Sequence, residues 1–112
     1  MAARIGKVAA DTSAFFLCDV QEKFRPMIRY FPEICTIAQR MSAASKVLDI
    51  PLIVSEHYPK ALGNTVPEID ISHGNVFPKT SFSMAVKDLK DHMKDVRPNL
   101  KSVILYGIEV SN

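Results

Sequence analysis

The chain has few of the residues that mark phosphate loops, metal sites and membrane spans. Only four of its 112 residues are glycine, and no Gly-rich phosphate-binding loop can be drawn from them. The three histidines and two cysteines lack metal-ligand spacing, so no metal and no other cofactor is expected. No apolar run approaches the roughly 20 residues of a membrane-spanning helix. The composition is that of an ordinary soluble globular domain.

The charge balance argues against a highly charged binding surface. Fourteen Lys and Arg residues and twelve Asp and Glu residues give a net charge of +2, and the basic residues are scattered among acids. Neither nucleic acid nor a membrane surface is therefore an expected partner. Cys18 and Cys35 are expected to be reduced packing thiols of a cytoplasmic protein, with peroxisome or mitochondrion as alternative locations.

Apolar segments and helical periodicity alternate along the first half of the chain. The continuous apolar run 13–19 predicts a strand that is buried on both faces of a parallel sheet. Pro32 and Pro51 then bracket a predicted helix, and residues 51–56 predict a second strand. The apolar positions at helical spacing are Ile34, Ile37, Ala38, Met41, Ala44, Val47 and Leu48. This order predicts a right-handed βαβ unit.

The second half predicts further α/β structure. The expected segments are a loop over 57–75, a short edge strand over 75–79, an amphipathic helix over 85–96 and a strand over 102–107 that reads as buried on both faces. The fold class is thus α/β, a partial Rossmann-like parallel sheet of about four strands with flanking helices. Residues 1–12 are expected to be a surface tail before a domain of residues 13–112.

Polar residues follow the predicted strands where a parallel sheet binds ligands. Asp19 and Lys79 come at the ends of apolar segments, so in parallel strands they would meet at the carboxyl edge. There the two would hold a carboxylate and an ammonium beside a substrate. Two other interpretations stay open, because Asp19 also suits a cap or turn and the pair also suits a simple salt bridge.

Glu56 and His57 follow the second predicted strand. A glutamate there could orient a substrate, and a histidine could act as acid or base. The favoured interpretation is that both are ordinary polar residues at the start of a loop.

Four segments together resemble the isochorismatase-like cysteine hydrolases, in particular the eukaryotic isochorismatase domain-containing proteins. The segments are 17–24 (LCDVQEKF), 56–68 (EHYPKALGNTVPE), 77–84 (FPKTSFSM) and 103–109 (VILYGIE). They occur in the order and with the spacing of the family, and they cover nearly the whole chain from Phe15 onward.

The resemblance implies a six-stranded parallel sheet and an Asp–Lys–Cys triad. Asp19 matches the general base that takes the thiol proton, and Lys79 matches the lysine that favours the thiolate. The cysteine would attack a small amide, ester or enol ether, and water would hydrolyse the covalent intermediate. The substrate pocket is expected to include Gln21, Phe24, Glu56 and Tyr58.

The chain departs from the family pattern at the nucleophile. The family cysteine lies six residues after the glycine that Gly107 matches, which is one position beyond Asn112. Cys18 is expected to point away from Asp19, and Cys35 lies in a predicted helix, so neither replaces it. We therefore expect a truncated and inactive hydrolase domain.

A different class of function is the alternative. The chain would then be a non-catalytic interaction or regulatory half-domain that pairs with a full-length relative. A homo-oligomer, or association through the exposed edge of the last strand, is expected in either case. An unrelated flavodoxin-like binding domain is disfavoured because the sequence has no phosphate-binding loop.

Overall fold

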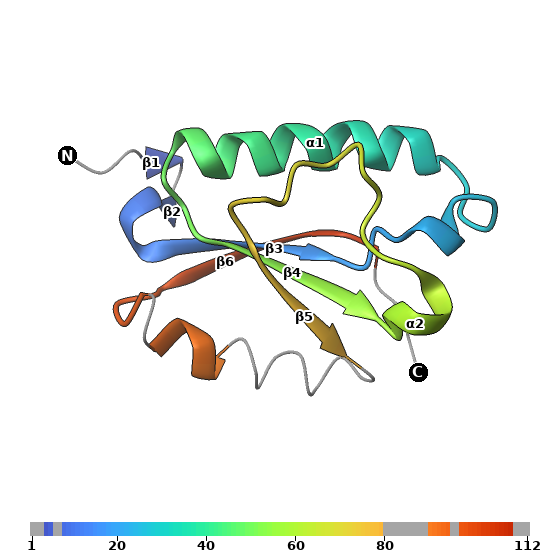
Figure 1. The fold of residues 1–112 in the computed structure, drawn as a ribbon. Helices are drawn as coiled ribbons and strands as arrows, with labels where there is room; N and C mark the ends of the chain where they lie inside the picture. Colours follow the sequence, from blue (N-terminus) through green and yellow to red (C-terminus); the bar gives the residue numbers. More distant parts are fainter. Residues whose placement is uncertain (1–3, 6–7, 80–89, 95–96, 109–112) are drawn as a thin grey trace.

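A four-stranded parallel sheet forms the centre of the molecule in the computed structural model, which describes residues 4–5, 8–79, 90–94 and 97–108 (Figure 1). The strands are β3 (Ser13–Cys18), β4 (Leu52–His57), β5 (Asn75–Lys79) and β6 (Ser102–Gly107). They lie in the order β5-β4-β3-β6, and every neighbouring pair is parallel. The predicted α/β class with a parallel sheet is confirmed.

Helix α1 (Phe31–Val47) crosses one face of this sheet (Figure 1). Tyr30 precedes it in the left-handed region, Pro32 lies in its first turn, and Glu33 favours the positive end of the helix dipole. The peptide N–H of Leu48 closes the last turn by donating to the carbonyl of Ala44 at 2.9 Å. The prediction of a helix between Pro32 and Pro51 is therefore confirmed.

Short elements surround the sheet. They are β1 (Arg4–Ile5), β2 (Val8–Ala9), η1 (Ala10–Thr12), η2 (Glu22–Phe24) and α2 (Pro59–Leu62). Because β1 and β2 pair as antiparallel strands, the segment predicted to be a tail contains local structure. Residues 90–94 are helical, as predicted, while 85–89 and 95–96 lie outside the described residues. No helix within the described ranges is long and apolar enough to cross a membrane.

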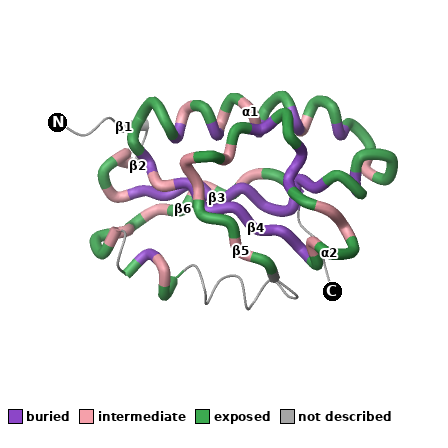
Figure 2. The backbone as a smooth tube through the Cα atoms, in the orientation of Figure 1, coloured by how far each residue is buried: buried purple, intermediate pink, exposed green. Residues whose placement is uncertain are grey.

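The two central strands are buried at every position, which the continuous apolar run predicted for β3 (Figure 2). Alternate side chains enter two cores on opposite faces. On the α1 face the core includes Phe15, Leu17, Phe31, Ala38, Leu52 and Val54. On the other face Ala14, Phe16 and Ile53 pack with Met93 from the helical residues 90–94.

The buried face of α1 differs from the apolar face of the sequence. Ser42 and Ser45 are fully buried, whereas Ile37 and Val47 are exposed. The buried serines are satisfied locally, because the Ser45 hydroxyl donates to the Ser42 carbonyl at 2.7 Å. The Ser42 hydroxyl in turn bonds the hydroxyl of Tyr106 at 2.9 Å. Two small polar residues therefore occupy the helix–sheet contact that periodicity assigned to apolar ones.

Strand β6 is not buried on both faces, so that prediction is wrong for the described structure. Its side chains alternate between half-buried and exposed. Ile104 and Tyr106 pack against the α1-side core, while Val103 and Leu105 are 37% and 56% exposed on the other face. The reason is that Met93 of the helical residues 90–94 packs over β3 and β4, and the described cover stops short of β6.

Candidate active site

The parallel register brings the predicted base and lysine positions to one edge of the sheet. Asp19 directly follows β3, and Lys79 is the last residue of β5. Strand β4 lies between them, with Ser55 opposite Cys18 and His57 opposite Lys79. The backbone positions of Asp19 and Lys79 thus share the carboxyl edge, while the side chain of Lys79 lies outside the described part. Their catalytic roles remain predictions.

Asp19 is held in place by β4. It is fully buried, and one carboxylate oxygen, Oδ1, accepts a hydrogen bond from the Ser55 hydroxyl at 2.8 Å. Its peptide N–H donates to the Ser55 carbonyl at 3.1 Å. The backbone turns here into the left-handed region, with φ of 57°, which aspartate tolerates better than most residues. Asp19 is therefore a turn residue as well as a buried acid at the ligand-binding edge.

Gly107 allows the end of β6 to lie directly against the turn at Asp19. Its φ is 116°, and a Cβ at this position would clash with the carbonyl oxygen of Cys18. The same carbonyl accepts a hydrogen bond from the N–H of Ile108 at 2.7 Å. Sequence reasoning used Gly107 only as part of a motif and missed this packing role.

Gln21 uses its buried side-chain amide to hold the loop that follows β4. Its Nε2 donates to the carbonyls of His57 and Gly63 at 3.0 and 2.7 Å, and its Oε1 accepts from the N–H of His57 at 2.7 Å. Phe24, another predicted pocket residue, is buried in the α1-side core. Gln21 thus orders the loop and Phe24 is a core residue, and direct substrate contact by either stays a prediction.

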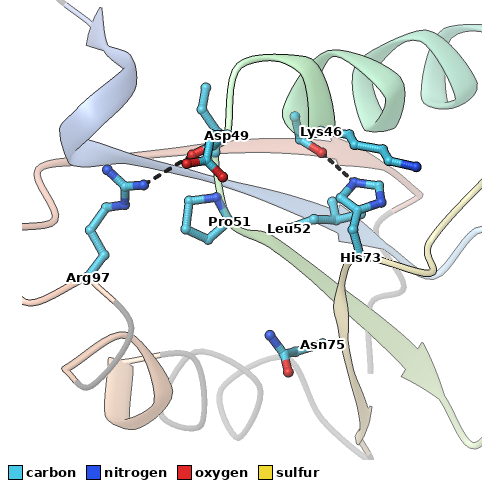
Figure 3. A pocket seen from close by; sticks show the side chains of 9 residues that line it. Lys46, Asp49, Pro51, Leu52, His73, Asn75 and Arg97 are labelled. Atoms are coloured by element: carbon cyan, nitrogen blue, oxygen red, sulfur yellow. Dashed lines mark hydrogen bonds between the residues drawn. The ribbon is translucent and has the colours of Figure 1, made fainter. Parts of the chain in front are cut away.

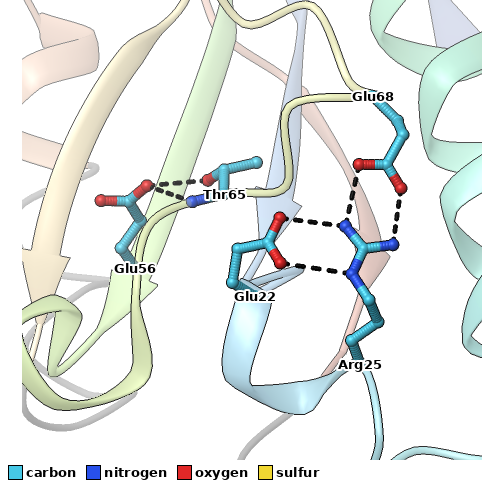
Figure 4. A network of polar contacts seen from close by, with 5 residues as sticks. All are labelled: Glu22, Arg25, Glu56, Thr65 and Glu68. Atoms are coloured by element: carbon cyan, nitrogen blue, oxygen red, sulfur yellow. Dashed lines mark hydrogen bonds and ion pairs between the residues drawn. The ribbon is translucent and has the colours of Figure 1, made fainter.

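Glu56 also holds this loop (Figure 4). Its Oε2 accepts from the N–H and the hydroxyl of Thr65 at 2.6 and 2.9 Å. Tyr58, the remaining predicted pocket residue, is exposed and has φ of 41°; its ring meets the ring of His57 edge-on at 4.7 Å. Glu56 and His57, which were expected to be ordinary polar residues at the start of a loop, are therefore the buried last two residues of β4.

Arg25 joins η2 to the far side of the same loop (Figure 4). Its guanidinium bonds both carboxylate oxygens of Glu22 and both of Glu68, at 2.7–3.2 Å. The hydrogen bonds from Arg25 hold the pKa of Glu68 below its usual value. Sequence reasoning missed this group, because nothing in the sequence pairs two charges that are 43 residues apart.

The two cysteines lie in the two cores. Cys35 packs between α1 and the sheet, and burial, with a smaller contribution from the charge of Glu68, raises the pKa of its thiol. A raised pKa leaves little thiolate at neutral pH. Cys18 ends β3 in the opposite core, beside Ala14 and Phe16. In the described ranges no three His, Cys, Asp or Glu side chains gather as metal ligands do.

A separate polar pocket of about 360 Å³ lies at the other end of the sheet (Figure 3). Leu52 and Asn75, the first residues of β4 and β5, line it together with Lys46, His73 and Arg97. The guanidinium of Arg97 donates to the backbone carbonyls of Ala10, Asp11 and Asp49, so it fastens three segments together. This pocket is remote from Asp19 because it lies where the strands begin.

Known proteins are similar to this chain in sequence and in fold. The chain is 45% identical over 106 residues to isochorismatase domain-containing protein 1 of Danio rerio, across 94% of this chain and 37% of that protein. It is 46% identical over 105 residues to isochorismatase domain-containing protein 2 of Homo sapiens, across 94% and 50%. Over nearly its whole length the chain is similar to isochorismatase domain-containing proteins. It spans half or less of the length of these two proteins, and no protein-family model matches it.

Solved structures of similar chains extend the family comparison to three dimensions. A structure described as MAR1 ribonuclease from Caenorhabditis elegans is 44% identical with a TM-score of 0.77, over 96% of this chain and 54% of that one. A crystal structure described as an isochorismatase family protein has a TM-score of 0.76 at 15% identity, over 90% and 66%. The second similarity concerns the fold alone.

Proposed function

We propose that Asp19 and Lys79 form the acid–base part of an isochorismatase-like hydrolase site. The observation that carries the proposal is the fully buried carboxylate of Asp19, fixed by Ser55 at the carboxyl edge that Lys79 shares. In the reaction, Asp19 takes the proton of a cysteine thiol and Lys79 stabilises the developing negative charge. The thiolate attacks a small amide, ester or enol ether, and water hydrolyses the covalent intermediate.

The thiols of this chain do not suit the role of nucleophile. Cys35 lies in the core under α1, where burial raises its pKa. Cys18 packs in the core on the other side of the sheet, below the edge where Asp19 turns. We therefore propose that the 112-residue chain supplies the base and the lysine but does not by itself turn substrate over.

A binding and turnover experiment tests both parts of this proposal. Benzamide added to the ¹⁵N-labelled chain is expected to shift the backbone amide signals of Asp19, Ser55 and Gly107, and Asp19→Asn should weaken this response. Benzamide and p-nitrophenyl acetate should show no steady hydrolysis by the purified chain. If the purified chain hydrolyses either compound and Asp19→Asn abolishes this hydrolysis, the proposal that the chain is inactive is refuted. If benzamide leaves the amide signals unchanged, the proposed site at Asp19 is refuted.

A second candidate function is association through β6, as a non-catalytic interaction module. Val103 and Leu105 are exposed, and the six residues of β6 contain no charge and no proline. At the other edge of the described sheet, β5 contains Pro78 and Lys79, which discourage strand addition. We propose that a second copy of the chain pairs here about a two-fold axis, each β6 adding to the other.

The molar mass in solution decides this second candidate. Light scattering at concentrations of tens of micromolar should give the mass of two chains. A monomer that stays monodisperse and unfolds cooperatively at the same concentrations would contradict the association.

A further inference from the structure

His57 occupies the place on the sheet edge between the two predicted site residues. It is the last residue of β4, and it is 5% exposed. The register of β4 and β5 places the backbone of His57 opposite that of Lys79. Ser55, which holds the carboxylate of Asp19, is two residues earlier and points the same way.

The backbone of His57 is fixed on both sides of its peptide. Its N–H and its carbonyl are bonded by Oε1 and Nε2 of the same Gln21 amide, at 2.7 and 3.0 Å. Its ring also meets the ring of Tyr58 edge-on at 4.7 Å. The backbone of His57 is therefore fixed, and its ring has an aromatic neighbour on one side.

One ring nitrogen of His57 makes no hydrogen bond within the described part of the chain. Nδ1 is buried and has no hydrogen-bond partner among the described residues. Buried polar atoms are nearly always paired, and exceptions call for an explanation such as a ligand. His73 also has an unpartnered nitrogen, but its Nε2 lies 2.8 Å from the Ser45 hydroxyl and the residue lies near the other end of the sheet. The Nε2 of His92 is unpartnered as well, and that ring packs on Phe77. Of these three histidines in the described ranges, His57 is the one that ends a strand at the edge where parallel sheets bind ligands.

We propose that His57 is a substrate-binding residue that favours a small carboxamide. The proposal rests on the hydrolase site of Asp19 and Lys79 and adds to it. A carboxamide satisfies either tautomer of His57, because its N–H donates to a bare Nδ1 and its carbonyl accepts from a protonated one. An ester can only accept, so it satisfies only one tautomer.

Imidazole nitrogen signals of the ¹⁵N-labelled full chain test this assignment. Benzamide should move the Nδ1 signal of His57 in a saturable manner and leave the signals of His73 and His92 unchanged. Methyl benzoate should bind more weakly. His57→Phe should lower the benzamide affinity about tenfold, the expected effect of losing one hydrogen bond. His57→Gln, which keeps a polar group, should lower the benzamide affinity less than His57→Phe does. His73→Phe should leave the benzamide affinity unchanged.

The readouts separate this proposal from the proposed function. If benzamide shifts the amides of Asp19 and Ser55 but not the His57 nitrogens, the role of His57 is refuted and the hydrolase site stands. If neither set of signals moves, both proposals are refuted. A dispersed amide spectrum of His57→Phe would show that weaker binding is not a loss of fold, and unchanged affinity in that variant would also refute the role of His57.

Discussion

Gly107 is the residue at which a single added carbon should do most damage to the sheet edge. An alanine there would meet the Cys18 carbonyl in a backbone conformation that side chains rarely adopt. We expect Gly107→Ala to lower the free energy of unfolding by about 2–4 kcal/mol. Urea unfolding followed by circular dichroism measures the loss.

Gly74→Ala is the matched control for this substitution. Gly74 does not have φ in the left-handed region, and its added Cβ would lie 3.1–3.2 Å from the side chain and the carbonyl oxygen of Leu52, a tight contact but a longer one than at Gly107. The loss should therefore be clearly smaller than at Gly107. Equal losses would show that the approach of β6 to Cys18 does not constrain the edge.

Single residues also show where sequence reasoning stops. The position of Asp19 could be predicted, because the end of an apolar run marks the end of a buried strand. The bonds of Gln21 to His57 and Gly63 could not, because they depend on which loop folds back over the strand end. The same holds for Arg25, whose charge partner Glu68 is distant in sequence.

At the scale of elements, α1 and β6 meet through a pH-sensitive contact. Tyr106 of β6 bonds Ser42 of α1, and burial raises the pKa of Tyr106 to about 12. An unfolded tyrosine titrates near 10, so the fold favours the neutral phenol. The stability that this preference contributes is complete below about pH 10 and is lost as the pH rises toward 12. Cys35 acts in the same direction, because the pKa of its thiol is also raised.

Tyr106→Phe is expected to flatten this alkaline loss of stability. At pH 7 the variant should be less stable by about 1 kcal/mol, because the bond to Ser42 is gone. Between pH 9 and 11.5 its unfolding free energy should fall less steeply than that of the parent chain. Tyr58→Phe, at an exposed tyrosine, is the control and should keep the parental slope. Parallel slopes for the parent and Tyr106→Phe would contradict the assignment.

Elements were easier to predict than the surfaces they bury. The bounds of α1 follow from Pro32 and Pro51, which act locally on the backbone. Its buried face depends on a partner, and the sheet accepts Ser42 and Ser45 because nearby groups satisfy their hydroxyls. The periodicity of apolar residues carries no information about such hydrogen bonds, so it could not predict that Ser42 and Ser45 are buried.

At the scale of the whole molecule, the two edges of the described sheet differ in their protection. If β6 pairs with a second copy, Leu105→Lys should place like charges close together across the two-fold axis and shift the mass toward one chain. Val47→Lys is the matched control, because Val47 is 83% exposed on α1, away from β6. If the dimer persists in Leu105→Lys, the interface does not lie at β6. The same conclusion follows if Val47→Lys disrupts the dimer equally.

The parallel arrangement itself followed from the sequence, but the place of each strand in the sheet did not. The apolar runs predicted β3 as a buried strand and β4 as a strand, and both are central. The run of β6 looks the same in sequence, yet β6 lies at an edge of the described sheet. A run of apolar residues indicates a tendency to be buried. Whether β6 is actually buried depends on which other segments of the molecule pack against it.

The strand order also has a consequence for synthesis on the ribosome. Strand β3 emerges first among the four and lies in the middle of the sheet, but its neighbour β6 is made last, with Ser13 opposite Ser102. At about 5–20 residues per second, one side of β3 stays unpaired for on the order of 10 s. During that interval the unpaired N–H and C=O groups along this side of an apolar strand are open to wrong partners, so this chain should depend on chaperones more than its small size suggests.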